Sequence, residues 1–530
     1  MARWKFWGWG VEGSGFDADE RKRLFDFYNA TFGEPSGPLQ TVPDASEIDL
    51  QRPRISPPES LAAICTSDPH ERLIRSHGKS FPEAVRIFAR DFRHPPDVVA
   101  MPTTEAEVIA VLDWAADADA AVVPFGGGSS VVGGVYAKVG DSFSGTISLD
   151  LKGLNRVLEV DQTSRAARLQ AGMLGPAIER ALKPYDLTLR HFPQSFEFST
   201  LGGWIATRSG GHFATLYTHI DDFVESLRVI TPAGPVESRR LPGSGAGPST
   251  DRLFIGSEGA LGVITEAWVR LQDRPTHRAT VSVGFDGLFE AARAVRAIAQ
   301  AGLYPSNLRV LDPMEARVNG AGDQALLVLG FESADHPIEP WLERGLELCA
   351  DHGGRLEGGA NADGAPPAAA AAAWRQAFIR MPYARELLMT ISALNDTFET
   401  AITWDRFEAF HDRVKTATEE AILEATGKPG VVTCRFTHVY PDGPAPYFTF
   451  HAMGRTEELL AQWHHVKGRA SEAVIEGGGT ITHHHAVGRD HMPWYERQRP
   501  VLMRDALAAA KRHLDPAGLL NPGVLFSPRA

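Results

Sequence analysis

The sequence predicts a mixed α and β protein built from two or more domains. The chain has 530 residues, which is more than a single compact core usually holds. From about Pro95 onward, short apolar segments with alternating polarity are interspersed with segments of helical period. A polar, Pro-containing stretch at residues 273–276 interrupts this pattern near the middle of the chain, as a domain boundary would.

The charge and cysteine content exclude several classes of protein. Lys and Arg number 53 against 66 Asp and Glu, a formal net charge of −13, so we expect no nucleic-acid partner. Cys65, Cys349 and Cys434 lie far apart, which predicts free thiols in a reducing compartment. No apolar run is long enough to span a bilayer, and no signal pattern opens the chain. We therefore expect a cytoplasmic protein.

The first 94 residues predict a helical and extended region. Aromatic residues crowd its beginning, at Trp4, Phe6, Trp7 and Trp9. They predict a strap packed on the body of the protein; the alternative is an anchor at a membrane surface, where Trp is favoured.

The remaining elements follow in chain order. Residues 17–32 predict an amphipathic helix, and residues 35–58 an extended connector rich in Pro and Ser. A capping box of Thr104 and Glu107 marks the start of a helix. Strands are predicted at 121–124, 147–151 and 157–160, a surface loop at 242–250, and a mobile loop at 359–373.

A glycine-rich loop follows the strand predicted at 121–124. Successive glycines let backbone N–H groups converge on an anion, and a pyrophosphate is a natural guest. By itself such a loop is weak evidence, and its spacing is not the Rossmann fingerprint. The segment consists of Pro124, Phe125, Gly126, Gly127, Gly128, Ser129 and Ser130.

Three further segments of small residues are suited to close backbone contact with a ligand. They comprise Pro193, Gln194, Ser195, Phe196, Glu197, Phe198 and Ser199; Ala206, Thr207, Arg208 and Ser209; and Ser257, Glu258, Gly259, Ala260, Leu261, Gly262, Val263 and Ile264. Together with the glycine loop, and in this order, they resemble the FAD-binding domain of the vanillyl-alcohol-oxidase class.

That resemblance implies FAD as cofactor and an α+β fold: a two-subdomain FAD-binding domain with an α+β cap domain. The implied divisions are 1–94, an FAD-binding domain at 95–273, a cap (substrate) domain at 274–480, and a C-terminal return to the FAD domain at 481–530. In some relatives a histidine of the first glycine loop bonds covalently to the flavin. The matching position here is Gly128 or Ser129, so we expect noncovalent FAD and a structural role for His212.

Further motifs lie at residues 3–10, 308–312, 397–400, 404–406, 433–435, 438–443 and 447–450. Through these motifs the whole chain resembles the alkyldihydroxyacetonephosphate synthase family. The resemblance implies FAD-dependent, redox-neutral synthesis of alkyl-dihydroxyacetone phosphate from acyl-dihydroxyacetone phosphate and a long-chain alcohol, a step of ether lipid biosynthesis. A homodimer and peripheral membrane contact are left open.

The family match also implies roles for individual residues. Tyr447 matches the proton donor and acceptor, which needs a cationic neighbour to lower its pKa if it is to act as a base. Arg435 matches the substrate-binding arginine, whose planar fork suits a phosphate. Arg309 matches an arginine important for activity.

A run of three histidines, His483, His484 and His485, matches the family's histidine triplet. It is predicted to bind phosphate or to transfer a proton. On a strand expected after Gly479, His483 and His485 would share one face and His484 would point away.

Flavin-dependent 2-hydroxy-acid dehydrogenases carry a glutamate where His484 stands, and use a metal near it. His438 and His491 could add ligands here, but that glutamate and the usual ligand pattern are absent. We therefore predict an anion site and no catalytic metal. The alternative function is an FAD-linked oxidase or dehydrogenase of a 2-hydroxy acid or alcohol; a flavin-binding protein without catalysis is a third reading.

Overall fold

The computed structural model describes residues 3–35, 37–213, 215–361 and 369–527. Its α-helices are α1 (Ala18–Phe32), α2 (Pro69–Ile74), α3 (Phe81–Phe88), α4 (Glu105–Asp117), α5 (Gly175–Leu182), α6 (Leu201–Thr207), α7 (Asp251–Phe254), α8 (Leu288–Gln300), α9 (Pro313–Val318), α10 (Glu339–Ala350), α11 (Ala369–Thr390), α12 (Trp404–Thr426), α13 (Leu459–Gly477), α14 (Met492–Gln498) and α15 (Val501–Leu514).

The strands form two groups along the chain. The first comprises β1 (Cys65–Thr66), β2 (Val98–Ala100), β3 (Ala120–Phe125), β4 (Gly145–Asp150), β5 (Val157–Asp161), β6 (Ala166–Gln170), β7 (Leu187–Thr188), β8 (Val224–Thr231), β9 (Gly234–Glu237), β10 (Val263–Arg270) and β11 (Gln272–Asp273). The second comprises β12 (His277–Phe285), β13 (Asn307–Leu311), β14 (Ala325–Ser333), β15 (Arg355–Asn361), β16 (Ala393–Glu399), β17 (Val431–Val439) and β18 (Pro444–Met453).

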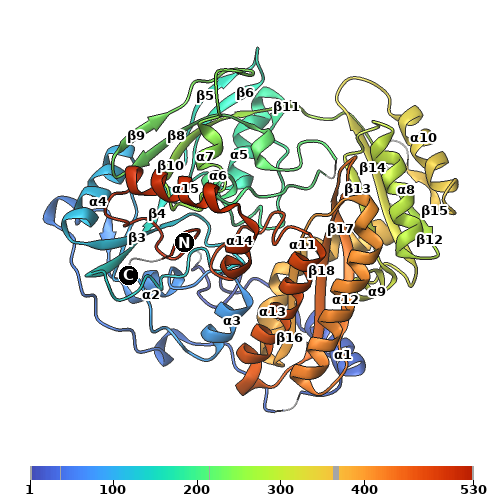
Figure 1. Ribbon diagram of the computed structural model, residues 1–530, viewed down its shortest axis with the longest axis horizontal. Helices are drawn as coiled ribbons and strands as arrows, with labels where there is room; N and C mark the ends of the chain where they lie inside the picture. Colours follow the sequence, from blue (N-terminus) through green and yellow to red (C-terminus); the bar gives the residue numbers. More distant parts are fainter. Residues whose placement is uncertain (1–2, 36, 214, 362–368, 528–530) are drawn as a thin grey trace.

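The first group of strands forms the N-terminal lobe, on the left in Figure 1. One sheet has the order β1-β2-β4-β3, with β4 parallel to both β2 and β3. The other has the order β5-β6-β10-β8-β9 and is antiparallel. Helices α14 and α15, from the end of the chain, lie across this lobe (Figure 1), and Leu520 makes a bridge to Val122 of β3.

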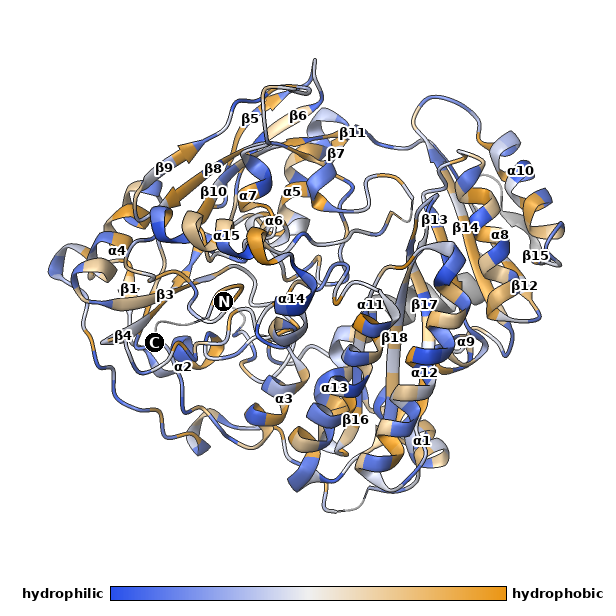
Figure 2. Cartoon of the chain, in the orientation of Figure 1, coloured by the Kyte–Doolittle hydropathy of each residue, from blue (hydrophilic) through white to orange (hydrophobic). Residues whose placement is uncertain are grey.

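The second group forms the cap lobe, a seven-stranded sheet of order β15-β12-β14-β13-β17-β18-β16. Successive side chains of a strand face opposite sides of a sheet. On β17, Cys434 and Phe436 therefore lie in the hydrophobic core with residues of α8, α12 and α13, whereas Arg435 between them lines a cavity. Figure 2 shows apolar strands in both lobes and hydrophilic residues on the outer helices. The α+β fold with a cap is confirmed.

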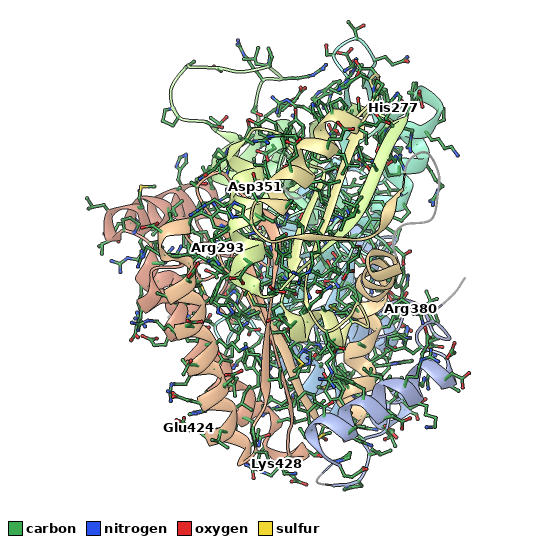
Figure 3. The ribbon with its side chains drawn as sticks, turned by 90° about the vertical axis from the view of Figure 1, so that its right-hand side faces the viewer. His277, Arg293, Asp351, Arg380, Glu424 and Lys428 are labelled. Atoms are coloured by element: carbon green, nitrogen blue, oxygen red, sulfur yellow. The ribbon has the colours of Figure 1, made fainter. Side chains whose placement is uncertain are left out.

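The N-terminal segment bridges the two lobes. Trp4 and Trp9 pack against Phe198 of the N-terminal lobe, while Lys5 forms a buried ion pair of 2.6 Å with Glu386 of α11. These contacts fit the predicted strap. The predicted helix at 17–32 is α1, which Figure 3 shows running along the cap lobe between Arg380 and Lys428.

Two local predictions were wrong. No strand follows Gly479: residues 479–487 form neither helix nor strand, because the backbone N–H groups of the histidines bind a side chain rather than a neighbouring strand. In the predicted mobile loop 359–373, residues 359–361 belong to β15 and 369–373 to α11; residues 362–368 lie outside the described part.

Several other predictions are confirmed. Thr104 and Glu107 form the capping box of α4, and the three cysteines are free thiols. Among the described helices, none has the length and apolar character needed to cross a membrane. The exact domain bounds stay a prediction.

Candidate active site

A cavity of about 840 Å³ has walls from both lobes. The N-terminal lobe contributes the glycine loop and the small-residue segments. The cap lobe contributes side chains of β13, β17 and β18, and helices α1 and α11 line the remainder.

The glycine loop forms a tight cradle in the cavity wall. A Cβ added to Gly127 would lie 1.8 Å from the carbonyl oxygen of Phe198, and one on Gly126 would lie 2.4 Å from Thr200 Oγ1. Gly128 adopts φ +65°, a conformation that favours glycine. The loop therefore needs glycine for its close packing and leaves its backbone facing the cavity.

Most residues predicted to bind the cofactor line the cavity. They are Pro124, Phe125, Gly126, Gly127, Gly128, Ser129, Ser130, Pro193, Gln194, Ser195, Ala206, Thr207, Ser209, Glu258, Gly259, Gly262, Val263 and Ile264. The others lie behind or beside this wall: Phe196, Glu197, Phe198, Ser199, Arg208, Ser257, Ala260 and Leu261. Some of these support it, as where Ser199 Oγ accepts the indole N–H of Trp204 at 2.6 Å.

Arg309, Arg435 and Tyr447 meet on the cap wall, as the sequence predicted for residues of one site. The guanidinium of Arg435 lies 3.9 Å from the centre of the Tyr447 ring, because the two residues are paired across β17 and β18. Burial and, to a smaller extent, the charge of the neighbouring Arg435 together lower the pKa of Arg309 to about 9. Two buried cations on one wall favour an anionic ligand.

A carboxylate that sequence reasoning missed holds Arg435 in place. Glu315 Oε1 accepts a hydrogen bond from Arg435 Nη1 at 2.6 Å, and the hydroxyl of Thr433 donates to the same carboxylate. Burial alone would lower the pKa of Arg435, but the charge of Glu315, its hydrogen bond and the nearby Tyr447 together outweigh burial and raise the pKa. Arg435 Nε is buried without a hydrogen-bond partner among the described residues, so it can still serve a ligand.

Tyr447 is a neutral phenol in this structure. Burial raises its pKa, and Arg435, which acts in the opposite direction, does not cancel the effect. Its hydroxyl donates to Thr397 Oγ1 at 3.0 Å. The cationic neighbour that the sequence required is present, but the resting side chain is a proton donor rather than a base.

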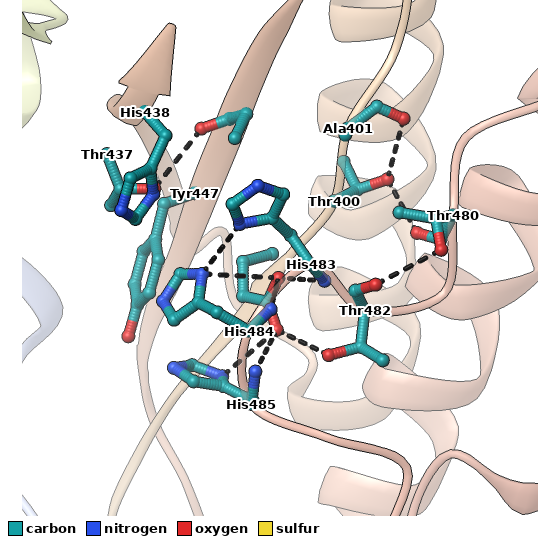
Figure 4. A network of polar contacts seen from close by, with 12 residues as sticks. Thr400, Ala401, Thr437, His438, Tyr447, Thr480, Thr482, His483, His484 and His485 are labelled. Carbon is teal, nitrogen blue, oxygen red and sulfur yellow. Dashed lines mark hydrogen bonds and ion pairs between the residues drawn. The ribbon is translucent and has the colours of Figure 1, made fainter. Parts of the chain in front are cut away.

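The three histidines, which Figure 4 labels, are held through their backbone N–H groups by the carboxylate of Glu399 at the end of β16. Their backbone N–H groups all donate to it, with distances of 3.1 Å from His484 and 2.8 Å from His485. Thr482 Oγ1 adds a bond of 2.6 Å. Glu399 belongs to the conspicuous segment 397–400, but its partners are more than eighty residues away in the chain.

The carboxylate of Glu399 and the imidazoles beside it differ in their charge state. Burial would raise the pKa of Glu399, but the adjacent histidines and hydrogen bonds outweigh it and lower the pKa to about 2. Burial holds the pKa values of His483 and His484 well below the ordinary value. The site therefore contains an ionised carboxylate beneath neutral imidazoles.

His438, His483 and His484 bring ring nitrogens within 4.8 Å of one another, close enough to consider a metal. However, both nitrogens of His438 already have protein partners, Thr437 Oγ1 and the carbonyl oxygen of Gly211. Those of His483 bond to His484 and Tyr440. A metal would have to replace these bonds, and the absence of a catalytic metal stays a prediction.

Comparisons with known proteins identify the two domain families of this chain. The family model "FAD binding domain" matches residues 96–238, and "FAD linked oxidases, C-terminal domain" matches residues 274–525. Alkyldihydroxyacetonephosphate synthase of Trypanosoma brucei brucei is 30% identical over 483 residues, which cover 87% of this chain and 78% of the relative. The chain belongs to the alkyldihydroxyacetonephosphate synthase family.

Other relatives place this synthase-family member within a wider group of flavoproteins. Glycolate oxidase subunit GlcD of Bacillus subtilis (strain 168) is 29% identical over 487 residues, covering 88% of this chain and 98% of the relative. A solved alkyldihydroxyacetonephosphate synthase structure shares the fold, with a TM-score of 0.80, 23% identity and 98% of each chain covered.

This family member is an FAD-dependent enzyme, and its residues fit the cofactor. The glycine cradle leaves backbone room for a pyrophosphate, and cavity walls from both lobes meet beside it. Neither Gly128 nor Ser129 can form a histidyl–flavin bond, and His212 is not among the residues that line the cavity. FAD is therefore held noncovalently.

Proposed function

We propose that this enzyme exchanges the acyl group of acyl-dihydroxyacetone phosphate for a long-chain alcohol. The observation that carries the proposal is a single cavity in which three kinds of wall meet. These are the cofactor cradle, a cationic and imidazole-rich wall on the cap lobe, and an apolar arm.

The polar wall suits the phosphate and the reacting carbon. Arg309 and Arg435 supply buried positive charge, and the planar guanidinium fork matches phosphate oxygens. Tyr447, packed against Arg435, offers a proton, and a bound substrate that changes its surroundings would let it take one back.

The apolar arm suits the two aliphatic chains. The apolar arm is a set of five apolar side chains that α1, α9 and α11 contribute to the cavity, beside polar ones such as Arg23 and Arg380: Leu24, Phe27, Val318, Met381 and Leu388. Burying each methylene of a chain contributes about 0.8 kcal/mol, so such an arm favours long substrates over short ones.

The exchange balances without a net oxidation. The ester C1–O bond breaks and the fatty acid leaves as a carboxylate with the bonding electrons. A new C1–O bond forms to the alcohol, whose hydroxyl proton is released. FAD, when bound, would supply an electron-accepting ring that can assist this exchange. The chain's own residues bind the phosphate, exclude water and hold protons.

A product assay tests the proposal. Purified protein with FAD is given palmitoyl-dihydroxyacetone phosphate and isotope-labelled hexadecanol, and the lipid extract is analysed by mass spectrometry. We expect a labelled alkyl ether that is absent when the Tyr447→Phe variant is used. No ether, together with bleaching of the flavin by a 2-hydroxy acid, would instead support the dehydrogenase alternative.

Cytoplasmic location with peripheral membrane contact is part of the proposal, because both substrates are lipids. Binding of the purified protein to phospholipid liposomes in a sedimentation assay is the expected result. Protein that stays entirely in the supernatant would contradict the membrane contact and leave the chemistry of the cavity unaffected.

A further inference from the structure

A continuous series of hydrogen bonds leads from the cavity toward the protein surface. It starts at His484, which lines the cavity and stacks on Tyr447 with ring centres 5.9 Å apart. His484 Nδ1 lies 3.0 Å from His483 Nδ1, and His483 Nε2 lies 2.7 Å from Tyr440 Oη (Figure 4 shows the histidine end).

The series continues beyond Tyr440 into the N-terminal lobe. Tyr440 Oη lies 3.1 Å from Thr218 Oγ1, which in turn lies 3.2 Å from His219 Nδ1. A direct approach of 3.5 Å also joins Tyr440 Oη to His219 Nδ1. His219 is half-buried, and the side chains just before it in the chain, Leu216 and Tyr217, are exposed.

The donors along this series can all point in one direction. His219 Nε2 lies 2.9 Å from the carbonyl oxygen of His483 and must donate to it, which leaves His219 Nδ1 as an acceptor. Thr218 can then donate to His219, Tyr440 to Thr218, and His483 to Tyr440. His483 Nδ1 is left as the acceptor for His484, whose remaining nitrogen Nε2 keeps its lone pair.

The surroundings hold the imidazoles in place and keep them neutral. Glu399 accepts the backbone N–H groups of His483 and His484 and so fixes the main chain of the loop, while the rings are oriented by their own bonds to one another and to Tyr440. His438 packs beside both rings but bonds to Gly211, outside the series. A neutral imidazole with a free lone pair can accept a proton and pass another on.

Ether formation requires such a path. The alcohol loses its hydroxyl proton when its oxygen bonds to carbon, and the fatty acid leaves as a carboxylate, so each turnover releases one proton. Aliphatic chains would fill the apolar arm at that moment. We propose that His484 accepts the proton and that His483, Tyr440 and Thr218 conduct it to the half-buried His219. His219 then becomes an imidazolium and returns to its neutral form by losing a proton to water beside the exposed Leu216 and Tyr217.

This inference rests on the proposed function and assigns residues that act during its last step. His484 would touch the reacting alcohol, whereas Tyr440, Thr218 and His219 act through it. If the histidines only bound phosphate, replacing Tyr440 would disturb substrate binding rather than proton transfer.

Two variants test the path. Tyr440→Phe removes only the hydroxyl group that joins the two lobes. His219→Gln removes the final proton acceptor but keeps an N–H donor for the carbonyl oxygen of His483. Tyr136→Phe is the matched control, because Tyr136 is a buried tyrosine outside the series. Each FAD-loaded protein is assayed with palmitoyl-dihydroxyacetone phosphate and hexadecanol in H₂O and D₂O.

We expect kcat to fall by about 10²-fold in both variants, with KM and FAD content unchanged. The solvent isotope effect on kcat should exceed that of the wild type, because proton release becomes rate-limiting. A Tyr440→Phe variant with the kcat of the wild type would overturn the path. So would a decrease in kcat that is accompanied by loss of FAD or that leaves the solvent isotope effect unchanged. Absence of ether from the wild-type protein would overturn the proposed function as well.

Discussion

The carboxylate of Glu399 accepts the backbone N–H of His485 at 2.8 Å, although the two residues lie on different segments of the cap lobe. This bond, repeated at His483 and His484, turns the histidine segment into a rigid loop. A strand would have alternated the three rings between two faces, whereas the loop gathers them around one charge.

Replacing this charge should loosen the loop. In Glu399→Gln, an amide N–H₂ would face the backbone N–H groups, and we expect a loss of about 1–3 kcal/mol in the free energy of unfolding. Thermal unfolding with a turnover assay measures it. The exposed Glu408→Gln is the control, and equal stability of both variants would contradict the prediction.

Removing the Tyr447 hydroxyl should abolish turnover and leave the cofactor bound. Tyr447→Phe keeps the ring against Arg435 but loses the group that donates to Thr397. Loss of a positioned proton-transfer group lowers kcat by about 10²–10⁴-fold. The FAD absorbance of the purified variant should equal that of the wild type, and full activity would remove Tyr447 from the mechanism.

The cradle should fail if Gly127 gains a side chain. In Gly127→Ala the new methyl would lie 1.8 Å from a backbone oxygen, so the loop must shift and FAD should be lost. Gly243→Ala, in the surface loop with nothing within 4 Å of the new methyl, should bind FAD normally. The ratio of FAD to protein after purification distinguishes the two variants.

The apolar arm should set the preferred alcohol. Met381→Trp would narrow it, and we expect the ratio of kcat/KM for hexadecanol to that for octanol to fall about tenfold. The same substitution at exposed Met503 should leave the ratio unchanged. An unchanged ratio in Met381→Trp would place the aliphatic chains elsewhere.

Stability should depend on pH through Glu258. Burial raises the pKa of this carboxyl to about 7 from an ordinary 4.5, even though the N–H groups of Val487 and Gly488 oppose the shift. Because the pKa is higher in the folded state, Glu258 contributes to the free energy of unfolding below pH 4.5. This contribution, up to ~3 kcal/mol, is lost as the pH rises toward 7. The free energy of unfolding of Glu258→Gln should not decline over this pH range. If it declined in parallel with that of the wild type, other groups would be responsible for the decline.

Much of the site could be anticipated from local features of the chain. The glycine loop and the capping box of α4 depend on neighbouring residues, and the structure agrees with both. The roles of Arg309, Arg435 and Tyr447 came from a family resemblance, and the structure brings the three together.

The partners of those residues could not be anticipated. Glu315 lies 120 residues before Arg435, and Tyr440 reaches Thr218 across 222 residues. Distance along the chain also explains why a strand was wrongly expected after Gly479. The backbone N–H groups of that segment bind Glu399, which is more than eighty residues away in the sequence.

By itself, the sequence determined an α+β protein with a glycine loop, because the absence of a Cβ and the alternation of a strand are properties of adjacent residues. The flavin and the family came from the resemblance of its motifs to known proteins. Only the tertiary structure decided which charges neutralise one another and where a proton can travel. Those relationships join segments from both lobes, and they exist only once the cap sheet packs against the glycine cradle.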